Sequence, residues 1–184
     1  MTSPTRQKFR FICLLFICFT WLFPAKAFAA YFFTVDSARI QSALLMYFPL
    51  REYRAAARLT LSEPMVILKQ DADKLQLDIS VLASIPGDGR KRGQVVADVG
   101  LHYKPSTGEL FLADPKIRGF AMKGITDESR KTFRASLSDI LIKTLPLVRI
   151  HQVREQDLNH SLSMSNMKSM RVEDGRIRVA IGFD

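Results

Sequence analysis

Cysteine is scarce in this chain. The 184 residues include two, Cys13 and Cys18, and both lie in an apolar run near the start. The chain that follows this run therefore has no disulfide, no thiolate nucleophile and no thiolate metal site. A domain without disulfides depends on its hydrophobic core, and roughly 155 residues are enough to build one.

Histidine is almost as rare, and the residue patterns of common active sites are missing. The histidines are His102, His151 and His160. Asp157, His160 and Ser161 are the residue types of a catalytic triad, but adjacent side chains on a helix point about 100° apart and cannot share a proton. There is no Gly-x-Ser-x-Gly sequence and no His-x-x-x-His spacing. We therefore expect a protein that is not an enzyme and that holds no metal and no cofactor.

The apolar run from Phe11 to Phe23 is short. It has roughly 13 residues, whereas a transmembrane helix needs about 20. Basic residues precede it and small residues follow it, which is the order of a cleavable secretory signal. We expect residues 1–29 to be removed on export, which leaves residues 30–184 as one soluble periplasmic domain.

Two cleavage frames fit the small residues after this run. Ala27-Phe28-Ala29 would direct cleavage before Ala30, and Ala25-Lys26-Ala27 would direct it before Phe28. We favour the first frame because it leaves Lys26 inside the polar cleavage region. Neither cysteine follows the small residues, as the lipid-attachment cysteine of a lipoprotein would.

Positive charge is concentrated at the start of the chain. Removing residues 1–29 leaves 23 of the 27 basic residues against 18 acidic ones, so the formal net charge falls from +9 to +5. A mildly basic surface of this kind favours anionic partners in the cell envelope, either a membrane surface or a protein. It is weak evidence for nucleic acid, and we expect no nucleic-acid partner.

Alternation of apolar and polar side chains dominates residues 30–184. No internal repeat or long flexible linker divides them, so a single domain is expected. A period of two predicts strands of an antiparallel sheet with one covered face. The expected strands are 31–35, 57–61, 66–68, 75–81, 95–103, 110–113 and 148–153, with a final hairpin of 170–172 and 177–183.

Helical spacing of apolar residues predicts two main helices, and hence an α+β fold. Asp36 would cap the first helix with its carboxylate, and Pro49 would end it. The second would run from Asp127 to Leu145, roughly 28 Å, which is long enough to cover a sheet face. Its apolar stripe is Phe133, Leu137, Ile140, Leu141 and Leu145.

A third, weaker helix is expected over residues 157–169. Met164, Met167 and Met170 recur at a spacing of three in this helix and directly after it. Core packing of a short helix is one interpretation of these methionines. A flexible lid over an apolar cavity is the other, because methionine packs adaptably against apolar surfaces.

The order of elements resembles a known family. The residues that carry the likeness are Phe33-Thr34-Val35-Asp36 with Ile40 and Leu44, the helix end Leu145-Pro146, and the closing stretch 170–179. Together they resemble the YceB-like family of bacterial envelope proteins, a domain of unknown function. The resemblance implies a strongly curved antiparallel sheet wrapped around the long helix, with a second, shorter N-terminal helix. This arrangement is similar to half of the tubular lipid-binding (TULIP-like) fold.

The apolar faces of the sheet and helix can pack solidly or enclose a void. The resemblance implies a void that holds a lipid or other apolar ligand, so the expected function is a non-catalytic binding protein. The residues expected to line it are Leu44, Phe48, Leu77, Ile79, Val99, Leu101, Phe133, Leu137 and Leu141. Burial of an acyl chain there would contribute about 0.8 kcal/mol per CH₂. The alternative is an envelope protein-interaction module with a solid core.

Basic residues follow a predicted turn at Pro86. Residues 87–93 are Gly-Asp-Gly-Arg-Lys-Arg-Gly, without the Lys-Ser/Thr pair of a Walker phosphate-binding loop. One interpretation is a solvated hairpin loop. The other is a contact of Arg90, Lys91 and Arg92 with anionic lipid headgroups or lipopolysaccharide, at about 1 kcal/mol for each basic side chain near the surface.

Overall fold

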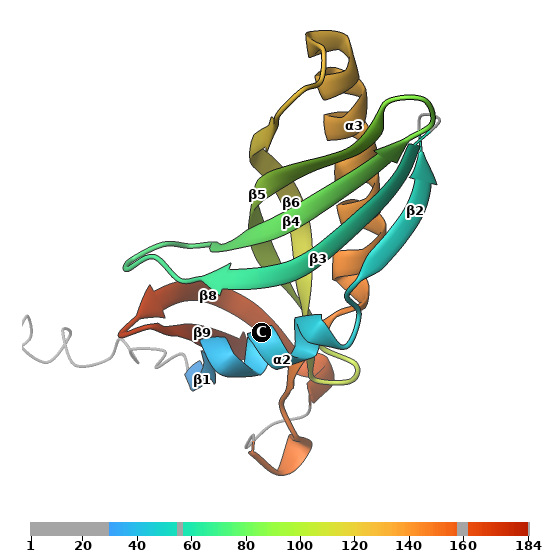
Figure 1. Cartoon of the computed structure of the whole chain (residues 1–184). Helices are drawn as coiled ribbons and strands as arrows, with labels where there is room; N and C mark the ends of the chain where they lie inside the picture. Colours follow the sequence, from blue (N-terminus) through green and yellow to red (C-terminus); the bar gives the residue numbers. More distant parts are fainter. Residues whose placement is uncertain (1–29, 55–56, 158–161, 184) are drawn as a thin grey trace, which may run out of the picture.

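The computed structural model describes residues 30–54, 57–157 and 162–183, so the predicted signal over residues 1–29 lies outside the described residues. The strands form two antiparallel sheets (Figure 1). The larger sheet consists, in spatial order, of β2 (Leu50–Arg54), β3 (Ala57–Ile67), β4 (Leu75–Ile85), β5 (Gly89–Lys104), β6 (Glu109–Met122) and β7 (Arg149–Gln152). The smaller sheet consists of β1 (Ala30–Asp36), β9 (Arg176–Phe183) and β8 (Ser165–Glu173).

The larger sheet is curled, and its inner face packs on the helix α3 (Asp127–Thr144) (Figure 1). Alternate residues of its strands are buried, as Leu75, Leu77, Ile79 and Val81 of β4 illustrate. A shorter helix, α2 (Ser37–Leu45), packs against β3. The predicted α+β class, with a curved antiparallel sheet around a long helix and a second shorter helix, is confirmed.

The long helix begins and ends where the sequence indicates. The Thr126 side chain accepts a hydrogen bond from the Ser129 backbone N–H at 3.2 Å, which satisfies one of the free first-turn donors. All five residues of the predicted apolar stripe are buried. The helix gives way at Leu145 to the 3₁₀ turn η1 (Leu145–Leu147), in which Pro146 cannot donate to a continuing helix.

The first helix differs from the prediction at both ends. The Asp36 side chain makes no capping hydrogen bond and instead pairs with Arg176 at 2.9 Å across the sheet. The helix ends at Leu45, and the backbone N–H groups of Tyr47 and Phe48 both donate to the Leu44 carbonyl in the turn that follows, at 2.9 and 3.2 Å. Tyr47 and Phe48 therefore lie outside the helix, ahead of Pro49.

The predicted weak helix over residues 157–169 is wrong. The described part of this stretch contains the 3₁₀ turns η2 (Glu155–Asp157) and η3 (Leu162–Met164), followed by the start of β8, while residues 158–161 lie outside the described residues. Pairing of β8 with β9 shifts register between Met167 and Ser169. A bulge of this kind inserts one extra residue, so Met167 and Met170 come to lie on the same inner face of a strand. Their spacing of three therefore reflects a β-bulge, and the exposed Met164 belongs to a different element.

The predicted turns agree with the structure better than the predicted first and third helices do. Asp174 and Gly175 join β8 to β9 with φ angles of 50° and 71°, which is the left-handed pair of a tight hairpin. The expected strands 57–61 and 66–68 are one strand, β3, with a bulge between them where pairing with β4 shifts between Ser62 and Met65. Strand β6 continues through Pro115, at a point where its pairing with β5 is irregular.

Candidate functional site

The nine residues expected to line a ligand cavity form part of the hydrophobic core. Seven of them are buried at 0–4% exposure, and Phe48 and Leu101 are partly buried against the same core. They come from α2, β4, β5 and α3, together with the turn after α2, so the structure does bring them together. Seven of the nine belong to one hydrophobic cluster, and Phe48 and Leu101 pack against it.

One member of this set also borders a surface hollow. Phe133 lines a hollow of about 350 Å³ between the β4–β5 turn and the start of α3, together with Ile85, Ile125 and polar residues of the first turns of the helix. Four other hollows on the described part of the chain are lined by residues other than the nine predicted ones.

The basic residues predicted to lie in a hairpin loop are in a strand. Strands β4 and β5 pair as far as Ile85 and Gly89, which leaves only Pro86, Gly87 and Asp88 for the turn. Gly87 and Gly89 take up the left-handed conformation, with φ angles of 80° and 78°, that so short a turn requires. Arg90, Lys91 and Arg92 therefore alternate between the two faces of β5.

Lys91 points to the inner face. It lies opposite the buried Ala83, its side chain would meet a Cβ added at Gly124, and its ammonium group is 3.0 Å from the Asp88 carboxylate. The Lys91 side chain is 23% exposed, much less than an outward-facing lysine. Lys91 therefore lies on the opposite face of the strand from Arg90 and Arg92, and the predicted contact of all three with one anionic surface stays a prediction.

Arg90 and Arg92 point outward, where two further arginines join them. The register places Tyr53, Arg58, Ser84 and Arg90 in one row across β2, β3, β4 and β5, and Arg51, Thr60, Leu82 and Arg92 in the next. Because alternate residues share a face, both rows lie on the outer face of the sheet. We call the four arginines of these rows, Arg51, Arg58, Arg90 and Arg92, the arginine face.

The arginine face carries uncompensated charge. Neighbouring strands are about 4.8 Å apart, so the backbones of Arg58 and Arg90 are about 10 Å apart and those of Arg51 and Arg92 about 14 Å. Within the described residues none of the four guanidinium groups makes an ion pair, and the other members of the two rows are uncharged. Four arginines held this close repel one another, and an anionic partner would relieve that repulsion.

Sequence reasoning missed Arg51 and Arg58 because they are distant from Arg90 along the chain. A signal was present in the sequence. Arg58 lies at a polar position of the predicted strand 57–61, and Arg51 lies at a polar position of the edge strand β2. Only the strand register converts these positions into one surface.

A hollow lies within the arginine face. It has a volume of about 410 Å³ and is bordered by Tyr53, Arg58, Ser84, Ile85, Pro86 and Arg90. The Arg58 guanidinium carbon lies 4.7 Å from the centre of the Tyr53 ring, which is a cation–π distance.

Titratable side chains of the described residues are the candidates for a metal or catalytic site. No group of three or more His, Cys, Asp or Glu side chains in them is arranged to hold a metal ion. Burial and the nearby Arg39 lower the pKa of His151. It lies at the joint between the two sheets and away from the arginine face. The pKa of Glu109 is lowered by hydrogen bonds from Thr107 and Arg149, which is typical of a surface ion pair.

No family model matches the chain, and no curated protein matches it. The resemblance to YceB-like proteins therefore stays a prediction. Over residues 30–54, 57–157 and 162–183, no helix combines the length and the apolar character needed to cross a bilayer.

Proposed function

We propose that this protein is a non-catalytic binding module of the bacterial cell envelope that docks on an anionic partner through the arginine face. The observation that carries the proposal is the register of Arg51, Arg58, Arg90 and Arg92 on one outer sheet face without ion-pair partners among the described residues. In this proposal the packed interior between α3 and the sheet is the rigid support that holds the four side chains in place.

Charge reversal tests the proposal directly. The protein recovered from expressing cells is titrated with polyglutamate and with anionic lipid vesicles, each at low and at high ionic strength. We expect binding to at least one of them at low ionic strength, and weaker binding in salt because exposed charges are screened. Arg51→Glu with Arg92→Glu should abolish it.

The matched control carries the same change of charge elsewhere. Arg130→Glu with Lys131→Glu alters two exposed basic residues on α3, away from the arginine face. If this control loses binding as completely as the first pair, the interaction reflects net charge alone and the proposed docking face is wrong.

A second candidate function is the binding of a lipid or other apolar ligand within the fold. The observation that favours it is the hollow beside α3, where Phe133 of the predicted lining set meets Ile85 and Ile125 at the surface. Native mass spectrometry of protein purified from cells tests it. A bound mass that disappears after Phe133→Asp but persists after Arg92→Glu would support this function, and a clean mass of the chain alone would count against it.

We also propose that the module works in the periplasm. Support comes from the basic, apolar and small-residue order of residues 1–29, which fits an export signal. Intact-mass measurement on protein from a periplasmic extract should give a chain that begins at Ala30 or, in the other frame, at Phe28. A full-length chain that stays in the membrane pellet would overturn both the location and the cleavage.

A further inference from the structure

We propose that the hollow in the arginine face binds the phosphate group of an anionic lipid headgroup. The inference rests on the proposed function, because it names the chemistry of the partner that this face contacts. It also narrows the contact from the four arginines of the two rows to one phosphate-binding position between Arg58 and Arg90, which we call the seat.

The polar side of the hollow suits a phosphate. Arg58, Ser84 and Arg90 are consecutive in one row, so the backbones of the two arginines flank that of Ser84, and all three residues line the hollow. The backbones of the two arginines are about 10 Å apart, and their long side chains can converge on a group placed above Ser84. Each guanidinium group can donate two parallel hydrogen bonds to phosphate oxygens. The Ser84 hydroxyl makes no hydrogen bond with the described residues, so it is available as a further donor.

The apolar side of the hollow distinguishes a lipid from free phosphate. Tyr53 and Pro86 form this side, and Tyr53 is 70% exposed at the edge of the sheet, whereas the neighbouring Ile85 packs against the core. Aromatic side chains with an apolar ring and a polar hydroxyl favour the headgroup level of a membrane. An inorganic phosphate ion would leave this apolar wall in water, whereas the glycerol and upper acyl carbons of a lipid would cover it. The combination of a two-arginine seat and an apolar wall therefore fits a phospholipid headgroup at a membrane surface.

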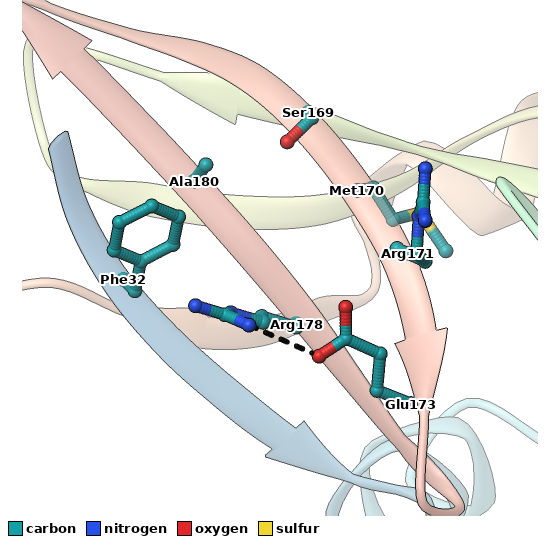
Figure 2. A pocket seen from close by; sticks show the side chains of 7 residues that line it. All are labelled: Phe32, Ser169, Met170, Arg171, Glu173, Arg178 and Ala180. Carbon is teal, nitrogen blue, oxygen red and sulfur yellow. Dashed lines mark hydrogen bonds and ion pairs between the residues drawn. The ribbon is translucent and has the colours of Figure 1, made fainter. Parts of the chain in front are cut away.

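The smaller sheet provides a built-in comparison. A hollow of about 290 Å³ on its outer face also contains an exposed phenylalanine, Phe32. Two arginines, Arg171 and Arg178, line the same hollow (Figure 2). Here Arg178 already has an anionic partner, because its guanidinium group is 3.1 Å from the Glu173 carboxylate and 4.6 Å from the centre of the Phe32 ring. A phosphate entering this hollow would have to displace Glu173 or be repelled by it. The hollow in the arginine face contains no acidic side chain.

Vesicle flotation tests the inference with the protein as recovered from expressing cells. The probes are vesicles of phosphatidylcholine alone, vesicles that also contain phosphatidylglycerol, and glycerol phosphate free in solution. We expect binding only to the vesicles with phosphatidylglycerol. Arg58→Gln with Arg90→Gln should weaken this binding about thirtyfold, because each basic residue near an anionic surface contributes about 1 kcal/mol. Ser84→Glu, which keeps both arginines but places a carboxylate in the seat, should weaken it as strongly.

The control pair is Arg171→Gln with Arg178→Gln, which removes the same charge from the other hollow. Thermal unfolding of each variant shows whether it is folded before its binding is compared. Equal weakening by the control pair would overturn the seat, and so would full binding by Ser84→Glu. Glycerol phosphate that saturates the seat as tightly as the vesicles would overturn the lipid source. Binding to polyglutamate but to no vesicle would overturn this inference and leave the proposed anionic docking intact, whereas binding to neither would overturn both.

Discussion

Phe33 and His151 stack at the joint between the two sheets, with ring centroids 4.5 Å apart and ring planes at 17°. Phe33 belongs to β1 and His151 to β7, an edge strand of the larger sheet. A second link crosses between the sheets where the Tyr103 and Ser165 hydroxyls lie 2.8 Å apart. The orientation of the smaller sheet relative to the larger one therefore depends in part on a ring that can take up a proton.

Stability should fall in mildly acidic solution because of His151. Burial lowers its pKa below the usual 6.5, Arg39 lowers it further, and Asp157 acts in the opposite direction. The neutral ring is thus favoured in the folded protein, while the unfolded chain takes up a proton near pH 6.5. The stabilisation is complete above that pH and is lost as the pH falls through 6.5 towards the lower folded pKa.

Replacing this ring by one that cannot ionise isolates the effect. His151→Phe keeps the stacking but should flatten the decline in unfolding free energy between about pH 7.5 and about pH 5, measured by urea denaturation. His102→Gln, at an exposed position of β5, is the matched control and should leave the decline unchanged. A decline that persists in full in His151→Phe would show that another group carries it.

Lys91 and Arg92 offer a test of the arginine face within two adjacent residues. Arg92→Gln removes an outward charge and should weaken binding to anionic vesicles about fivefold. Lys91→Gln removes the same charge from the inner face and should leave binding unchanged. The dissociation constants of the two variants can be compared by vesicle flotation at one ionic strength. Similar losses in both would mean that Lys91 also reaches the partner and that the arginine face as defined is wrong.

The interior between α3 and the sheet should respond to truncation as a packed core does. Leu137 is fully buried in it, so Leu137→Ala should lower the free energy of unfolding by about 2–5 kcal/mol. Ile142→Ala, on the same helix but 53% exposed, should change it by less than about 0.5 kcal/mol. Urea denaturation measures both. A cost at Leu137 as small as that at Ile142 would indicate an interior loose enough to hold a ligand.

Local patterns predicted those parts of the fold that depend on neighbouring residues. The apolar stripe of α3 and the Asp174-Gly175 hairpin are encoded within one helix and one turn, and both are confirmed. The arginine face could not be predicted in this way, because Arg51 and Arg90 come together only through the register of β2, β3, β4 and β5. The helix predicted around Met167 failed for a related reason: a bulge in a strand reproduced helical spacing.

Gly108, in the β5–β6 turn, should tolerate an added side chain poorly. Its φ is 67°, and an added Cβ would lie 2.2 Å from the Val153 carbonyl oxygen. The backbone N–H of Val153 donates to the Gly108 carbonyl at 2.8 Å. Gly87 has a similar φ of 80° in the β4–β5 turn but open space around it. Gly87→Ala should therefore cost only the left-handed strain of about 1–2 kcal/mol. Gly108→Ala should lower the free energy of unfolding by at least that amount again, because the backbone of residue 153 must move. Equal midpoints for the two variants in urea would show that the chain after β7 yields freely and does not hold the turn.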